Sequence, residues 1–161
     1  MGIISEIAGI EEQSFNDPWS EKSLEETFKH DHNHLIAVFD DGTTVDDYVF
    51  QGNEKLAGYL IYSEVAGEAE LLRIAVDETM RHRGFGGKLM EHFISELEFM
   101  NAEKVTLEVR KGNSAAIGLY TIYGFEQIAV RKDYYMDPDE DAVIMQRPIA
   151  KNDDEIGRFS E

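Results

Sequence analysis

The spacing of apolar residues predicts two helices at the start of the chain. Ile3, Ile7 and Ile10 recur at helical spacing, and Asp17-Pro18 then interrupts the pattern. Ser20 follows this break and is of the residue class that caps helix N-termini, so a second helix is expected to begin there.

Apolar runs and alternating patterns predict strands through the rest of the chain. The run at 70–77 is continuously apolar apart from single charges, which is typical of a strand buried on both faces. The segment 40–46 is polar and predicts a turn, and Gly52-Asn53 is a hairpin signal between two strands. The other expected strands are 34–40, 48–50, 56–66, 104–110, 125–130 and 142–145.

Two further helices are expected in the second half. Apolar residues form one helical stripe at Leu89, Met90, Phe93, Ile94 and Leu97. Asn113 or Ser114 can cap a shorter helix that runs through Tyr123 and ends at Gly124. This order predicts one α/β or α+β domain around a single sheet over residues 1–149. Residues 150–161 lack core residues, so we expect them to form a polar, disordered tail.

Composition restricts the class of protein. At 161 residues and 42% apolar residues, the chain is long enough for one globular domain. No apolar run reaches the ~18 residues that cross a bilayer, and the first residues do not resemble a secretory signal. The chain has no cysteine, which excludes disulfides and thiolate chemistry. We therefore expect a cytoplasmic protein that does not enter membranes; its oligomeric state is left open.

The charge is strongly negative, at -18 from 15 basic and 33 acidic side chains. Such a chain repels phosphates, so we expect no direct binding of nucleic acid. Two interpretations remain open: attraction of a basic partner, such as a cationic protein tail or a polyamine, or solubility alone.

One segment reverses this charge: residues 81–88, RHRGFGGK. It lies between a predicted strand and a predicted helix, where the first-turn N–H groups lack partners and favour anions. Gly84 and Gly86 allow close approach, and Arg81 and Arg83 supply counter-charge. The spacing matches neither the Walker nor the Rossmann fingerprint. The segment predicts a cradle for a diphosphate.

This region resembles a known family. IAVDETMRHRGFGGKLMEHFISELE is similar to the acetyl-CoA-binding segment of the GNAT superfamily of N-acetyltransferases. TLEVRKGNSAAIGLYTIYGFEQIAVRKDYY, EDAVIMQRPI and DPWSEKSLEE resemble the bacterial RimI family. The resemblance covers residues 1 to about 149 and implies the GNAT fold: a single mixed, mostly antiparallel sheet with splayed central parallel strands, flanked by helices.

The resemblance implies an activity. RimI enzymes transfer acetyl from acetyl-CoA to the N-terminal alanine of a small-subunit ribosomal protein, so the implied partner is a basic protein N-terminus. An α-amine loses its proton about 2.5 pH units more easily than a lysine, which suits a single modest base. Two alternatives stay open: acetylation of a small amine such as a polyamine, and a non-catalytic acyl-CoA-binding module.

The resemblance also implies roles for site residues. Glu108 would be the general base and Tyr120 the acid that protonates the leaving thiolate. Alternatively, Glu108 pairs with Arg110 or with another surface cation, and Tyr120 is only a packed aromatic. The expected cofactor contacts are Ile74, Ala75, Val76, Arg81, His82, Arg83, Gly84, Phe85, Gly86, Gly87 and Asn113.

The peptide is expected to bind at Arg73, Tyr134 and Tyr135, near a group of acidic residues at 137–141. Trp19 either lines the opening in which the peptide is expected to bind or, in the interpretation that we prefer, anchors the second helix. His30, His32 and His34 could share one face of an extended segment, but the polar surroundings indicate an exposed loop, and no metal site is expected.

Overall fold

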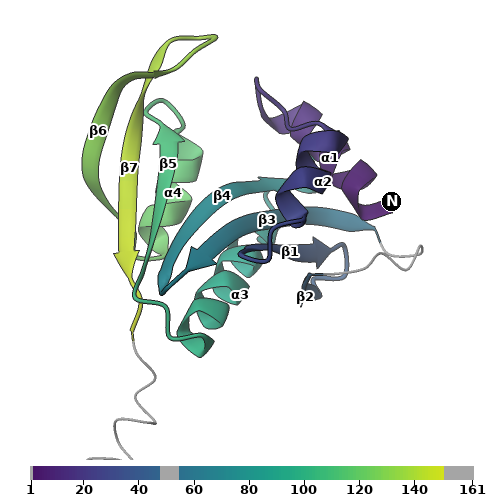
Figure 1. The fold of residues 1–161 in the computed structure, drawn as a ribbon. Helices are drawn as coiled ribbons and strands as arrows, with labels where there is room; N and C mark the ends of the chain where they lie inside the picture. The colour runs from purple at the N-terminus through teal and green to yellow at the C-terminus, as the bar shows by residue number, and fades with distance from the viewer. Residues whose placement is uncertain (1, 48–54, 151–161) are drawn as a thin grey trace, which may run out of the picture. The chain divides into compact units, whose positions relative to one another are not determined.

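The computed structural model describes residues 2–47 and 55–150. Seven strands form one sheet in the order β2-β1-β3-β4-β5-β7-β6. Most pairings are antiparallel, and β4 pairs with β5 in parallel from Glu68–Lys104 to Leu71–Leu107. The predicted α+β class, with a mixed and mostly antiparallel sheet flanked by helices, is confirmed (Figure 1). The elements are α1 (Gly2–Ser14), α2 (Glu21–Phe28), β1 (Asn33–Phe39), β2 (Thr44–Asp46), β3 (Leu56–Val65), β4 (Glu68–Val76), the short 3-10 helix η1 (Glu78–Met80), α3 (Phe85–Phe99), β5 (Lys104–Arg110), α4 (Ser114–Ile122), β6 (Glu126–Tyr135) and β7 (Glu140–Pro148).

The contacts of the chain divide it into two compact units. Unit 1 comprises residues 1–63 and 72–93, and unit 2 comprises residues 64–71 and 94–161. Both β4 and α3 contribute residues to each unit.

In unit 1 the two N-terminal helices cover one face of β1 and β3. The predicted stripe of α1 is buried at Ile3, Ile7 and Ile10 and packs with Leu24 of α2. Ser20 caps α2 as expected, since its hydroxyl accepts a hydrogen bond from the Ser23 amide at 3.1 Å. Because successive strand residues face opposite sides, the strand residues in this cluster share one face. They are Leu35, Ala37, Phe39, Tyr59 and Ile61.

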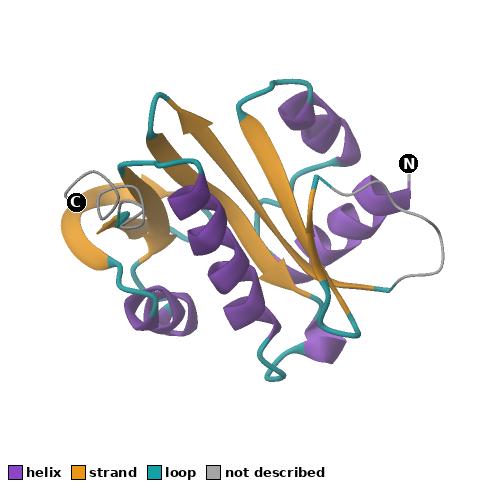
Figure 2. Ribbon diagram, turned by 90° about the horizontal axis from the view of Figure 1, so that it is seen from below, coloured by secondary structure: helices purple, strands orange, loops and turns teal. Residues whose placement is uncertain are grey.

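The opposite face of these strands is covered by α3. The ring of Tyr62 on β3 lies 4.8 Å from the ring of Phe93 on α3, measured between centroids. Figure 2 shows the long helix α3 against the strands. Leu89, Met90 and Phe93 are fully buried, which confirms the predicted stripe within this unit. Helices on both faces bury the strands of unit 1, which is why β1 and β3 carry almost unbroken apolar sequences.

Unit 2 is built on β5 and the β6–β7 hairpin. β5 alternates as predicted, with Val105, Leu107 and Val109 buried, and it pairs with β7 along its length. α4 ends at Ile122 with Tyr123 as its C-cap. Gly124 follows with a φ of +90° and lies against the Arg147 side chain of β7. The edge strand β6 is exposed at nearly every position.

Several expected boundaries were wrong. The predicted turn at 40–46 contains β2, because Thr44–Asp46 pair with Ile36–Val38 of β1. β4 is not buried on both faces, since exposed Glu68 and Glu70 alternate with buried Ala69 and Leu71. β6 and β7 are longer than predicted because they pair with each other beyond their apolar centres. The predicted strand at 48–50, the turn at Gly52-Asn53 and nearly all of the predicted tail lie outside the described residues.

Candidate active site

The glycine-rich segment forms the connection from β4 to α3 in unit 1. Asp77 opens it by accepting hydrogen bonds from the amide and hydroxyl of Thr79, at 2.9 and 2.6 Å. η1 follows, and α3 begins at Phe85, within the glycine-rich segment itself. The segment therefore lies at the N-terminus of a long helix, as the sequence predicts.

The backbone of this segment has the form of an anion site. The N–H groups of residues 82–86 donate to no acceptor in the described part of the chain, and the amide of Lys88 is the first to find one, at Gly84 O, 3.1 Å away. His82 and Gly84 have left-handed φ values of 67° and 83°, a backbone conformation that occurs in the turns whose amides bind anions. A Cβ built on Gly84 would meet nothing within 4 Å, so the space beside it is open.

The side chains of the segment differ in what they can offer a ligand. Arg81 donates from Nε to Val76 O and from Nη2 to Ser14 Oγ, each at 3.1 Å, so much of its guanidinium is already engaged. Phe85 is buried in the core, which leaves only its backbone to a cofactor. His82 and Arg83 are exposed, and Gly86 and Gly87 are half-buried at the start of α3.

The three β4 residues predicted to contact the cofactor lie just before this segment. A Cβ on Gly58 of β3 would come within 2.7 Å of Ala75 O and 3.2 Å of the Val76 Cα. The backbone of β3 therefore packs tightly against Ala75 and Val76 on one side. Ile74, Ala75 and Val76 follow the part of β4 that pairs with β5. Ala75 is buried, whereas Ile74 and Val76 are half-buried.

Arg73 is engaged by unit 1 itself. Its Nη2 lies 3.1 Å from Oε1 of Glu11 and donates to Asp17 O at 2.8 Å. Its guanidinium also lies over the rings of Phe15 and Trp19, at 4.1 and 4.7 Å. Arg73 thus holds the segment between α1 and α2. Its contact with a substrate stays a prediction.

Glu11, the partner of Arg73, was missed at the sequence level. It is fully buried and accepts hydrogen bonds from the Trp19 amide at 2.8 Å and from the Tyr59 hydroxyl. Burial raises the pKa of Tyr59, and the Glu11 charge raises it further. The available signal was its position, since Glu11 follows Ile7 by four residues on the apolar stripe. Trp19 anchors the start of α2, the interpretation that we preferred.

Glu108 lies on the polar face of β5 in unit 2. Its carboxylate accepts a hydrogen bond from the Tyr134 hydroxyl, which raises the pKa of Tyr134. Arg131 Nη1 lies 3.9 Å from Glu108 Oε1. The alternative that Glu108 pairs with a surface cation is confirmed with Arg131 as that cation. Arg110 is not the partner, because it pairs with Glu140 at 3.4 Å.

A second carboxylate, Glu70, belongs to the same group and was not predicted. Partial burial and the negative charge of Glu108 raise the pKa of Glu70, while Arg131 opposes the shift. Glu70 pairs with Thr106 on β5, two residues before Glu108, so the two acids occupy the same face of neighbouring strands.

Tyr120 is almost completely buried in α4, with 6% of its surface exposed. Its ring lies 5.8 Å from that of Phe125. Burial raises the pKa of Tyr120, and Tyr135 adds to the shift, so the hydroxyl stays protonated at neutral pH. Tyr120 is therefore both a packed aromatic and a retained proton donor.

Asn113 caps α4, as predicted, with Oδ1 accepting from the Ala116 amide at 3.1 Å. Tyr134 and Tyr135 meet edge to face at 5.1 Å, and each has an arginine over its ring, Arg131 and Arg110 respectively. Unit 2 thus brings together Glu108, Asn113, Tyr120 and the tyrosine pair, while unit 1 holds Arg73 and the glycine-rich segment.

The three histidines at 30–34 have separate surroundings. His30 and His32 lie in a turn with ring centroids 5.5 Å apart, whereas His34 belongs to β1 and stacks on Tyr62. His34 Nδ1 lies 3.6 Å from Asp47 Oδ2. No helix in the described ranges has the length and apolarity needed to cross a membrane.

Comparison with known proteins agrees with this fold. The profile of the acetyltransferase (GNAT) family matches residues 4–125. The [ribosomal protein bS18]-alanine N-acetyltransferase of Escherichia coli K12 is 36% identical over 143 residues, which cover 88% of each chain. N-alpha-acetyltransferase RimI of Mycobacterium tuberculosis is 32% identical over 142 residues, covering 87% of this chain and 83% of its own. The crystal structure of the ribosomal-protein-S18-alanine N-acetyltransferase from Escherichia coli superposes with a TM-score of 0.78 at 33% identity, covering 94% of this chain and 91% of that one.

The chain belongs to the GNAT family of acetyltransferases. Within the family it is similar along most of its length to the RimI type, which confirms the resemblance drawn from the motifs. Members of the GNAT family use acetyl-CoA as the acetyl donor.

Proposed function

We propose that this protein acetylates the N-terminal α-amine of an alanine, and that its substrate is ribosomal protein bS18. The similarity over 88% of the chain to an enzyme named for this reaction carries the proposal. Two features of the described residues support it: unit 2 has a carboxylate for the amine proton and a buried tyrosine hydroxyl, and unit 1 has a set of backbone amides without acceptors.

The predicted cofactor residues are assigned to acetyl-CoA, which supplies the acetyl group as a thioester. The amides of residues 82–86 would hold its diphosphate, since they lack protein partners and lie at a helix N-terminus. The side chains of His82 and Arg83 are free to reach phosphate oxygens, while Arg81, Phe85, Gly86 and Gly87 act chiefly through their backbone. Ile74, Ala75, Val76 and Asn113 are assigned to the pantetheine arm.

Glu108 is assigned the role of general base, which accepts the proton of the attacking amine. The attacking species is the neutral amine, which forms far more easily from an α-ammonium, with a pKa of about 7.7–8.0, than from a lysine at about 10.4. Glu108 then accepts the proton that the nitrogen loses as it bonds to the thioester carbon. The interaction with Glu108 raises the pKa of Tyr134, which is consistent with a Tyr134 hydroxyl beside the Glu108 carboxylate. Tyr120 is assigned the role of general acid, which donates a proton to the departing thiolate. Its hydroxyl keeps its proton at neutral pH and is therefore able to donate it.

The acidic character of the chain supports a basic peptide as substrate. Its net charge is -18, and Asp137, Asp139, Glu140 and Asp141 follow the tyrosine pair. Tyr134, Tyr135 and Arg73 are proposed to contact the N-terminal residues of the peptide. The same negative charge would favour a polyamine, which is the competing substrate class.

Steady-state turnover tests the proposal and separates the two substrates. A peptide with the N-terminal sequence of bS18 is expected to be acetylated, whereas spermidine and the same peptide with a blocked N-terminus are not. Glu108→Gln and Tyr120→Phe should each lower kcat by about a hundredfold or more while leaving acetyl-CoA affinity unchanged. Preferential turnover of spermidine would overturn the substrate assignment, and absence of any turnover would indicate a binding module.

A further inference from the structure

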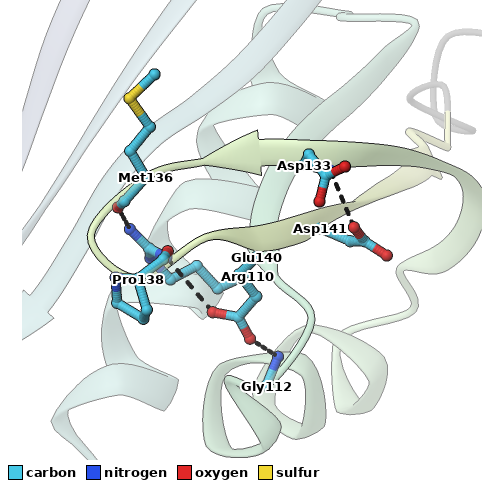
Figure 3. Close-up of polar contacts among 7 residues, drawn as sticks. All are labelled: Arg110, Gly112, Asp133, Met136, Pro138, Glu140 and Asp141. Carbon is cyan, nitrogen blue, oxygen red and sulfur yellow. Dashed lines mark hydrogen bonds and ion pairs between the residues drawn. The ribbon is translucent and has the colours of Figure 1, made fainter.

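Arg110 connects the end of β5 to the segment between β6 and β7. Its Nη2 donates to Met136 O at 2.8 Å, and its Nη1 donates to Pro138 O at 2.9 Å (Figure 3). Its Nη1 also lies 3.4 Å from Oε1 of Glu140. The guanidinium stacks over Tyr135 at 4.5 Å from the ring centroid. One side chain therefore binds two carbonyls, one carboxylate and one aromatic face of the same hairpin.

Glu140 extends the connection to the start of α4. Its Oε2 accepts from the Gly112 amide at 2.5 Å (Figure 3). A Cβ on Gly112 would lie 2.5 Å from this same oxygen, so only glycine leaves room for the contact. Gly112 immediately precedes Asn113, whose own amide donates to Arg110 O at 2.9 Å.

These contacts are shielded although the hairpin end is exposed. The side chains of Arg110 and Glu140 are only 22% and 25% exposed, whereas Met136 is 76% exposed. A second contact closes the base of the hairpin, where the Asp133 amide donates to Asp141 Oδ1 at 2.9 Å (Figure 3). Charge-assisted hydrogen bonds that are partly shielded from water hold their geometry well. The hairpin end is thus fixed by its contacts with Arg110 rather than by a core of its own.

We propose that Arg110 is a positioning residue for the peptide substrate: together with Glu140 and Gly112 it holds residues 134–140 in a fixed relation to Asn113. This inference rests on the proposed function, in which Tyr134 and Tyr135 contact the peptide and Asn113 contacts the cofactor. A segment held in place before binding loses little conformational freedom when the peptide arrives. Arg110 itself touches neither reacting group.

The arrangement predicts a specific kinetic change. Arg110→Gln removes the stacking cation and both carbonyl contacts, and Arg110→Lys keeps the charge but cannot reproduce the planar fork. Both variants should raise KM for the peptide about tenfold, with kcat and KM for acetyl-CoA within about twofold of the wild type. Gly112→Ala, which displaces Glu140 from the other side, should give the same pattern. Arg147→Gln is the matched control, since Arg147 also donates to a carbonyl in unit 2, that of Pro148 at 3.4 Å, and should change neither constant.

Hydrogen exchange gives a second measurement that needs no substrate. The amides of Met136, Asp137 and Asp139 should exchange faster in the Arg110 and Gly112 variants than in the wild type or the Arg147 control. Unchanged peptide KM in Arg110→Gln, or a fall in kcat alone, would overturn the inference, as would unchanged exchange at these amides. If the wild type acetylates no peptide, the proposed function fails, and the exchange result still decides whether Arg110 holds the hairpin.

Discussion

Two arginines, Arg73 and Arg110, have the same kind of environment in different units. Each pairs with a glutamate, donates to backbone carbonyls of a connecting segment, and lies over an aromatic ring. A guanidinium suits this task because its planar array of donors binds several acceptors at once. Both residues stabilise connecting segments, and the segment held by Arg110 follows the proposed peptide contacts Tyr134 and Tyr135.

Arg73 should matter strongly for stability. Its partner Glu11 is fully buried, so Arg73→Ala leaves a charge without its counter-ion and should lower the free energy of unfolding by about 3–5 kcal/mol. Chemical denaturation measures this change. The control is Lys29→Ala, which breaks an exposed pair with Glu26 and should cost about 1 kcal/mol or less. Equal effects of the two substitutions would contradict the buried pair.

Glu70 gives a prediction about pH. Its pKa is raised above the ordinary 4.5, so the folded state holds this proton more tightly than the unfolded state, and the contribution of Glu70 to stability falls as pH rises above 4.5. Glu70→Gln removes this loss. The variant should therefore be more stable than the wild type at pH 7, with the difference vanishing below about pH 4.5, when unfolding is measured across a pH series. A difference independent of pH would argue against the shift.

At the scale of elements, the sequence predicted those helices and strands whose apolar pattern lies within the element itself. β5 and α3 have strong period-two and helical patterns and were found as expected. β2 was missed because three residues in a polar stretch become a strand only by pairing with β1. The length of β6 was missed for the same reason, since its exposed residues pair with β7 across the hairpin.

The glycine-rich segment offers the sharpest test at this scale. Gly84→Glu puts a negative charge beside the proposed diphosphate and should abolish acetyl-CoA binding, measured by calorimetry. Gly84→Ala adds neither charge nor a steric conflict, although the φ of 83° disfavours any side chain. The affinity of this variant for acetyl-CoA should therefore fall far less than that of Gly84→Glu. Tight acetyl-CoA binding by the Gly84→Glu variant would contradict the cradle. Both variants should remain folded, because a Cβ on Gly84 contacts nothing within 4 Å.

For the molecule as a whole, the motifs predicted the family and most candidate site residues, but not their partners. The glycine-rich segment, Glu108 and Tyr120 lie within short recognisable stretches. The contacts of Arg73 with Asp17 and of Arg110 with Glu140 join residues 56 and 30 positions apart. Only the tertiary fold decides which carboxylates and backbone carbonyls each arginine contacts. These contacts could therefore not be predicted from local sequence.

The central claim is that this protein acetylates the N-terminal alanine of bS18. The direct measurement is mass spectrometry of the intact bS18 N-terminus in cells that contain the wild-type protein, the Glu108→Gln variant, or neither. We predict the mass of one acetyl group on bS18 with the wild type alone. An unmodified bS18 N-terminus in the presence of the wild type, or equal acetylation in all three samples, would contradict the account.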